Sequence, residues 1–179
     1  FVVCFSCFFK KQSVCFNSIV YFNDLGSSTS TNTVIIDVAA NGGNAYKPRA
    51  IEVNSSQDYT FVSNDGTVQQ THLSGCSLNK KGSGTLTIDC ENNFNSVTVD
   101  EGTLALTDSK ALGDSCLLTT AADSHLIIGQ SSVEEIDVTL STESTRLYGE
   151  VTVEAGSTLR YTVSNGYNAG HTTVDGTLA

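Results

Sequence analysis

The stretch from Lys80 to Gly129 reads KKGSGTLTIDCENNFNSVTVDEGTLALTDSKALGDSCLLTTAADSHLIIG and determines how the rest of the chain is interpreted. Apolar residues alternate with Thr, Ser or Asp in short bursts, namely Leu86 and Ile88, Val97 and Val99, Leu104 and Leu106, and Leu126 and Ile128. A period of two is typical of a strand with one buried face. Clusters of Gly, Asn, Asp and Ser between the bursts predict tight turns. The stretch therefore predicts a series of short strands without helices.

The composition of the whole chain agrees with that interpretation. Among 179 residues, Met and Trp are absent, Pro occurs once and Gly occurs 15 times, which suits strands and turns better than helices. The formal net charge of -10 disfavours nucleic acid and anionic membrane surfaces as partners. It fits an exported or surface-displayed protein, and it would allow loose binding of divalent cations.

Residues 1–33 differ from the rest and are expected to form an irregular N-terminal segment. Two apolar runs, Phe1 to Phe9 and Val14 to Phe22, are separated by charge and are each too short to span a membrane as a helix. They fit a signal-peptide remnant, an irregular strand pair or a mistranslated upstream segment. The polar stretch from Ser27 to Thr33 is expected to be a linker. Both ends of the chain are expected to have been cut from a longer protein.

The six cysteines give no clear redox signal. Cys4, Cys7 and Cys15 lie among apolar residues without a fourth ligand, so buried thiols or one local disulfide are favoured over a zinc site. Cys76, Cys90 and Cys116 are predicted to be packing residues, although an exported setting would permit a bridge between Cys76 and Cys90.

A repeat of about 20 residues runs through the strand region. Leu86, Leu104 and Leu126 recur 18 and 22 residues apart, and Val153 and Val174 recur 21 residues apart. One such unit has an apolar row with nothing to bury it against, whereas stacked units form continuous interior ladders. Residues 34–179 are therefore predicted to be an all-β parallel β-solenoid without end caps. An antiparallel sandwich is the competing fold, because alternation alone does not specify strand direction.

The segment from Lys80 to Gly113 resembles a known family. The order Lys81-Gly82-Ser83-Gly84-Thr85-Leu86, Asn92-Asn93-Phe94, Val97-Thr98-Val99, Gly102-Thr103-Leu104 and Ala111-Leu112-Gly113 is similar to the passenger-associated repeat of bacterial autotransporters. The close match covers about a fifth of the chain. In that family the Asn-rich element is a turn that carries an aromatic residue. The Cys content and the residues Asp89-Cys90-Glu91 depart from the family pattern.

The resemblance implies a right-handed parallel β-helix at the bacterial cell surface, extracellular and associated with the outer membrane. It implies an adhesin or structural passenger, with host surfaces, matrix or glycans as ligands. It also implies a C-terminal β-barrel translocator elsewhere in the full-length protein, while this segment itself neither inserts into a membrane nor binds nucleic acid.

No residue is predicted to be catalytic, to bind a cofactor or to bind a metal. The acidic residues fall in turns, where capping and solvation explain them; they are Asp89, Asp100, Glu101, Asp108, Asp114 and Asp123. The basic residues nearby are Lys80, Lys81 and Lys110, and the histidines His72, His125 and His171 are each expected at the surface. Two other functions stay open, a glycan-active β-helix enzyme and a phage tail-fibre segment.

Overall fold

The computed structural model describes residues 18–24, 32–64, 71–130, 135–142, 144–162, 167–168, 170–174 and 176–179. The described chain is all-β, and its one regular helical element is the short 3-10 turn η1 (Ala39–Asn41). The apolar segment from Phe1 to Phe9, the cysteines Cys4, Cys7 and Cys15, and most of the expected linker lie outside the described residues.

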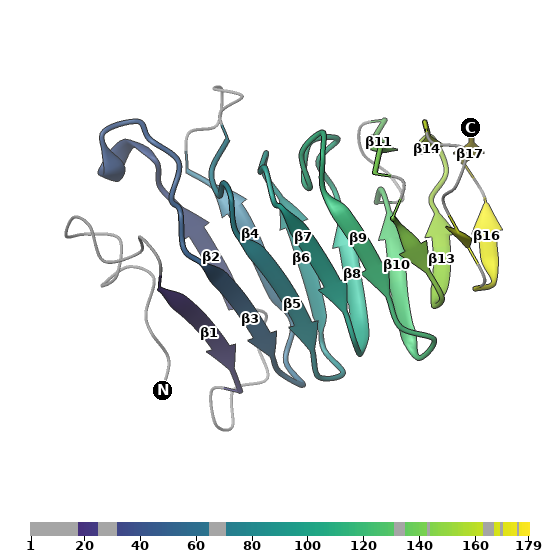
Figure 1. Ribbon diagram of the computed structural model, residues 1–179, viewed down its shortest axis with the longest axis horizontal. Helices are drawn as coiled ribbons and strands as arrows, with labels where there is room; N and C mark the ends of the chain where they lie inside the picture. Colours follow the sequence, from purple (N-terminus) through teal and green to yellow (C-terminus); the bar gives the residue numbers. More distant parts are fainter. Residues whose placement is uncertain are drawn as a thin grey trace.

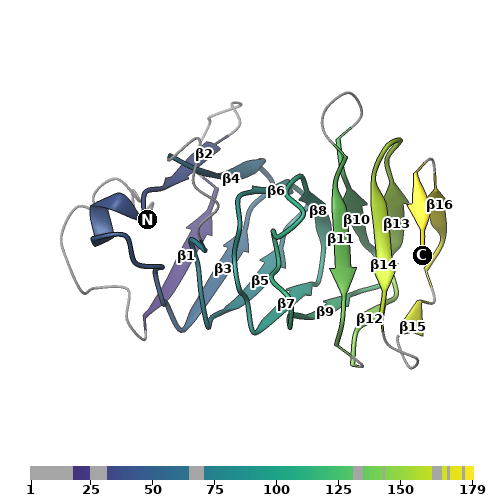
Figure 2. The ribbon, with the colours of Figure 1, turned by 90° about the horizontal axis from the view of Figure 1, so that it is seen from above.

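Three parallel sheets make up the described fold, and the strands lie side by side along its long axis (Figures 1 and 2). The first sheet contains β1 (Ile19–Asn23), β3 (Ala50–Asn54), β5 (Ser77–Lys81), β7 (Ser96–Val99), β9 (Leu117–Thr120), β12 (Arg146–Leu147) and β15 (Tyr167–Asn168). The second contains β2 (Asn32–Ile36), β4 (Tyr59–Ser63), β6 (Thr85–Asp89), β8 (Gly102–Leu106), β10 (Ser124–Ile128), β13 (Glu150–Val153) and β16 (Thr172–Val174). The third contains β11 (Asp137–Leu140), β14 (Thr158–Tyr161) and β17 (Thr177–Leu178).

The chain alternates between the first two sheets, so each strand pairs with the strand one repeat away. Every strand pair in the described residues is parallel, which excludes the antiparallel sandwich. The predicted repeat is confirmed residue by residue. Leu86 pairs with Leu104, Leu104 pairs with Leu126, and Val153 pairs with Val174.

The core consists of ladders of inward side chains. In the second sheet, Phe61, Ile88, Leu106, Ile128 and Val153 are successive partners, and all are fully buried or nearly so. Near the N-terminal end, the rings of Phe22 and Phe61 approach to 5.2 Å between centroids within the core. Burial of each large apolar side chain stabilises the fold by about 1.5–3 kcal/mol. The ladders are therefore the main favourable contribution to folding.

A third side links the second sheet back to the first in the earlier repeats. Isolated parallel bridges join Tyr46 to Leu73 and Ser74 to Asn93, at positions before the third sheet begins. The resemblance implied a turn at Asn92-Asn93-Phe94, but this expectation is wrong. The segment is extended, with Asn92 and Phe94 buried and Asn93 exposed between them.

Regular structure begins earlier than the sequence suggested. The boundary expected at residue 34 is too late, because β1 occupies Ile19–Asn23 and pairs along its whole length with β3. Val20 and Phe22 are buried and belong to the core. The apolar residues just before residue 23 are therefore core residues of the first sheet.

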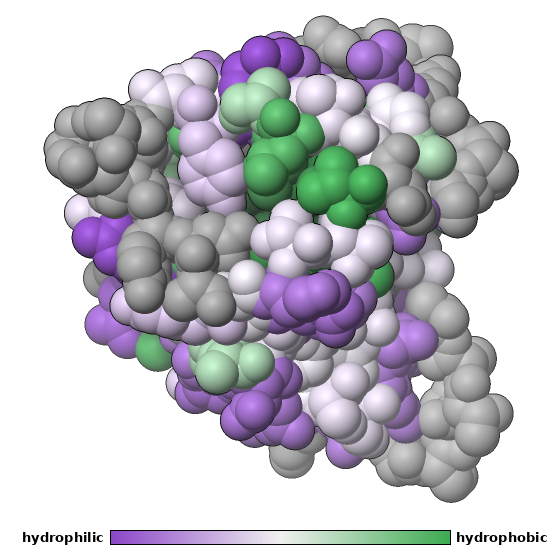
Figure 3. Space-filling model, turned by 90° about the vertical axis from the view of Figure 1, so that its right-hand side faces the viewer, coloured by the Kyte–Doolittle hydropathy of each residue, from purple (hydrophilic) through white to green (hydrophobic). Residues whose placement is uncertain are grey.

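The end of the molecule formed by the last strands has apolar residues at its surface. Figure 3 looks at this end and shows apolar side chains in the middle, surrounded by polar ones. Val174 is 39% exposed and Leu178 is 49% exposed, in strands that lie last in their sheets. Among the described residues, no strand pairs with the outer edges of β15, β16 and β17.

The ladders predict a sharp difference between neighbouring positions of one strand. Replacing Leu104 with Ala should lower the free energy of unfolding by about 2–5 kcal/mol, because the loss of three side-chain carbon atoms leaves a cavity in a fully buried ladder. Replacing Thr103 with Ala, on the outer face of the same strand, should change it by less than about 0.5 kcal/mol. Urea denaturation followed by circular dichroism measures both, and equal effects would contradict the inward and outward assignment of β8.

Candidate functional site

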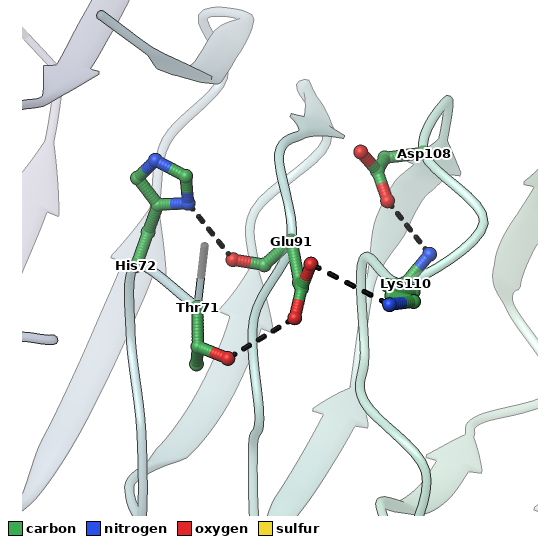
Figure 4. A network of polar contacts seen from close by, with 5 residues as sticks. All are labelled: Thr71, His72, Glu91, Asp108 and Lys110. Carbon is green, nitrogen blue, oxygen red and sulfur yellow. Dashed lines mark hydrogen bonds and ion pairs between the residues drawn. The ribbon is translucent and has the colours of Figure 1, made fainter. Parts of the chain in front are cut away.

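A network of polar side chains lies on the third side of the molecule (Figure 4). Its members come from the segments that lead into β5, β7 and β9. The Glu91 carboxylate accepts a hydrogen bond of 3.2 Å from the Thr71 hydroxyl and lies 3.8 Å from the Lys110 ammonium. The Asp108 carboxylate accepts a bond of 2.6 Å from the main-chain N–H of Lys110. Three successive repeats therefore contribute to one polar column.

The chemistry of this network is that of a surface ion pair. Lys110 is half exposed, so its attraction to Glu91 contributes little stability. His72 contacts the main chain of Glu91, with its Nδ1 3.1 Å from the carbonyl oxygen, and is separate from the carboxylate bonds. The Asp108 carboxylate is used to hold its own turn. The column thus connects three successive repeats and orders the third side.

Asn92 stabilises the third side from within. Its side-chain oxygen accepts a hydrogen bond of 3.0 Å from the N–H of Leu73, and its amide donates to the carbonyl oxygens of Cys90 at 2.8 Å and Ala111 at 3.2 Å. The amide therefore joins the segments before β5, β7 and β9 where regular ladder bonds are incomplete. Because buried main-chain groups without partners are costly, this side chain is a structural requirement.

Lys80 is the most unusual residue of the first sheet. It occupies an inward position between Val53 and Val99 and is only 1% exposed. Its ammonium lies at the corner after β5, where it donates to the carbonyl oxygens of Lys81 at 3.0 Å, Gly82 at 2.5 Å and Glu101 at 3.2 Å. The charge is thus held by main-chain oxygens from two successive corners.

Gly102 makes room for this corner. Its φ of +72° is a left-handed conformation that favours glycine. A Cβ atom there would collide with the carbonyl oxygens of Gly82 and Gly84 and would come within 2.8 Å of the Lys80 ammonium. The Gly-x-Gly and Gly-Thr-Leu elements of the sequence motif therefore meet at one crowded corner.

Gly102 and Gly75 give a matched test of that crowding. Both have positive φ, but a Cβ on Gly75 would have nothing within 4 Å. Replacing Gly75 with Ala should lower the free energy of unfolding by about 1–2 kcal/mol, the cost of a left-handed residue. Replacing Gly102 with Ala should lower it by more than about 3 kcal/mol or prevent folding, because backbone atoms must move. Denaturation curves, or the folded fraction by circular dichroism, compare the two, and similar losses would contradict the corner geometry.

The protonation of Lys80 should make stability depend on pH. Burial lowers the pKa of its ammonium from 10.5 to about 8, and the carboxylates of Glu101 and Asp58 oppose this shift in part. Between those two pH values the unfolded chain binds more protons than the folded chain, so stability rises with pH, by at most about 1 kcal/mol per pH unit. Below the folded pKa both states are protonated and this contribution is constant.

A comparison with Lys80→Met isolates this effect from other titrating groups. The unfolding free energy of the native chain minus that of the variant should increase as the pH rises from about 8 to 10.5. Urea denaturation at a series of pH values measures the difference. A difference that stays constant over this range would show that Lys80 has the same pKa in the folded and unfolded chains.

The acidic residues considered in the sequence are spread over several corners. Asp100, Glu101 and Asp123 follow strands of the first sheet, and Asp108 follows a strand of the second. Asp89 is the last residue of β6, and Asp114 precedes β9. Asp89 accepts a hydrogen bond of 3.0 Å from the Thr107 hydroxyl, and the main chain of Glu101 binds Lys80. In the described part of the chain, no three His, Cys, Asp or Glu side chains are grouped so that they could hold one metal ion.

The three histidines have different environments. His72 was expected at the surface, and this is wrong, because it is 2% exposed against the third side. His125 is partly exposed on the outer face of β10, with its Nε2 2.8 Å from the Thr152 hydroxyl, and His171 is exposed. His72 and Leu73 are neighbours in the sequence and both are buried, so a period of two does not identify the buried face here.

The predicted packing role of three cysteines is confirmed. Cys76, Cys90 and Cys116 are buried and form no disulfide with one another, so the optional bridge between Cys76 and Cys90 is not formed. Burial raises the pKa of the Cys76 and Cys116 thiols to about 12. These thiols therefore stay protonated at neutral pH and are poor nucleophiles.

Comparison with protein-family models, with curated proteins and with solved structures finds no match to this chain. Within the described ranges, no helix has both the length and the apolar character needed to cross a membrane.

Proposed function

We propose that this chain is a structural and adhesive segment of a surface-displayed, exported protein of the autotransporter passenger type, and that it coils as a right-handed β-solenoid. The observation that carries the proposal is the continuous register of the two long parallel sheets. Such an arrangement makes a stiff scaffold whose outer face can vary without changing the core. The segment holds its ligand by surface contact and catalyses no reaction itself.

The right-handed coil follows from a general property of parallel strands. The connection from β5 through β6 to β7 returns the chain to the first sheet as a parallel neighbour of β5. Connections of this kind are right-handed in about 98% of cases, because right-twisted strands favour that crossover.

The outer faces supply the surface for adhesion. On the second sheet, Thr60 pairs with Thr87, and Thr85 pairs with Thr103, all partly exposed. On the first sheet, Thr98 pairs with Thr119 in the same way. Short β-branched side chains in columns present hydroxyl groups on a flat surface with little rotamer entropy to lose. This favours contact with hydroxyl-rich or extended ligands such as glycans and matrix proteins.

The family resemblance supports the proposal through the structural roles of its motif. Gly82, Gly84 and Gly102 meet at the crowded corner after β5, while Ala111 and Leu112 are buried on the third side. The motif residues are thus those that a stacked repeat requires. Export by a C-terminal β-barrel and display at the bacterial cell surface belong to the same proposal.

Binding assays with outer-face variants test the adhesive function. The full chain should bind at least one of collagen-coated surfaces, fibronectin-coated surfaces, neutral polysaccharides or acidic polysaccharides. The variant Thr87→Glu alters the outer face of the second sheet, and the variant Thr98→Glu alters the outer face of the first sheet. One of the two variants should weaken binding at least tenfold. Both should leave the unfolding midpoint nearly unchanged, because neither residue is in the core.

The same assays separate the competing functions. Cleavage of a polysaccharide would replace the adhesive proposal with a glycan-active enzyme, and Glu91→Gln would then test a carboxylate that lies near an ammonium of the next repeat. A stable trimer by light scattering would favour a tail-fibre segment. Failure to bind any of the four surfaces would contradict adhesion.

A further inference from the structure

Three side chains that are far apart in the sequence form one column on the outer face of the second sheet. They are His125 in β10, Glu150 in β13 and His171 just before β16. His125 and Glu150 are register partners. The next pair in the ladder, Val151 with Thr172, places His171 beside Glu150, and the N–H of Val151 donates to the carbonyl oxygen of His171 at 2.9 Å.

All three residues lie on the solvent side of the sheet. Their neighbours Leu126 and Val151 are fully buried, so the alternation of each strand directs His125 and Glu150 outward. Glu150 and His171 are exposed and His125 is partly exposed. The His125 ring already extends across the strands, because its Nε2 lies 2.8 Å from the hydroxyl of Thr152 in β13, the strand that carries Glu150.

We propose that His125, Glu150 and His171 bind one zinc-class divalent ion on the outer face of the second sheet. Neighbouring parallel strands lie about 4.8 Å apart, so the two histidine backbones are about 10 Å apart with the glutamate between them. Two imidazoles from the outer strands and a carboxylate from the strand between them supply three ligands of the types that zinc prefers. A water molecule or a group from a binding partner completes the tetrahedron.

The side chains assemble around the ion by rotation. In the structure they are not grouped at one point, and the His125 ring bonds to Thr152. Exposed side chains change rotamer within nanoseconds, and neither Glu150 nor His171 is enclosed by the core. The backbone already has the required spacing, so binding needs no change in the sheet. The net charge of -10 raises the local concentration of cations.

The chain carries its own control, since its third histidine is His72. That residue lies on the third side, 2% exposed, and its Nδ1 contacts the main chain of Glu91. It is therefore kept away from an ion on the second sheet. Glu101, exposed at a corner, provides a carboxylate of equal charge outside the column.

Zinc titration of the full chain, with accessible thiols alkylated to remove binding by cysteine, tests the site. Calorimetry should show one Zn²⁺ per chain. His125→Ala, His171→Ala and Glu150→Gln should each weaken binding at least tenfold, whereas Glu101→Gln should leave it within twofold. In nitrogen-15 NMR spectra, the ring signals of His125 and His171 should shift on addition of Zn²⁺ and those of His72 should not.

Several results would overturn the site. These are absence of Zn²⁺ binding by the alkylated chain, binding that persists in the double variant of His125 and His171, and a shift of His72 without the other two. Circular dichroism of each variant establishes that the fold is intact, as expected for substitutions on the outer face. The outcome is independent of the adhesive function, because the titration contains no ligand other than the metal.

Discussion

The fold depends on one constraint, that each strand must meet the next with its inward residues in the same register. A shift of one residue would turn every inward side chain of a strand outward, because the side chains alternate. In the second sheet, the partners of Leu104 on both sides are leucines. A slip of one residue would replace these inward leucines with outward residues of β6 and β10, such as Thr87 and His125. The repeat length of about 20 residues varies, but the register does not. Corners absorb the differences in length.

Two polar side chains inside the molecule show how the backbone is satisfied where ladder bonds are incomplete. Lys80 interrupts an apolar ladder between Val53 and Val99, and Asn92 lies between the segments of the third side. Burial of an ammonium is costly in itself. Here the cost is offset by three carbonyl oxygens, those of Lys81, Gly82 and Glu101, which accept hydrogen bonds from the ammonium at the corner after β5. The polar groups inside are therefore located at the places where the strands end.

Much of the fold could be predicted from the sequence, because period two and the recurrence of leucines directly reflect burial and stacking. The interior polar residues could not, although the signal was present. Leu78 and Lys80 continue one alternation, and Cys90, Asn92 and Phe94 continue another, so period two alone would have placed all five inward. Residue chemistry points the other way, because lysine is rarely buried and asparagine is typical of turns. In the folded chain, carbonyl oxygens of neighbouring repeats favour burial of the lysine and asparagine side chains. The positions of these oxygens depend on tertiary structure.

The early start of regular structure at β1 is hard to predict for a similar reason, since Val20 and Phe22 become core residues only when β3 lies beside them.

The same constraint explains why functional groups are hard to find in such a sequence. Register brings together residues that are separated by the whole length of a repeat, so His125, Glu150 and His171 become neighbours although 25 and 21 residues separate them. Catalytic or binding motifs are usually recognised by short spacing along a helix or loop. In stacked parallel strands the relevant spacing is one repeat, and it varies with corner length. The outer columns are also free of packing demands, because the inward residues alone secure the core. Polar chemistry can therefore change on the outer faces without loss of the fold, and a search for function in this chain should follow the strand register and not the linear sequence.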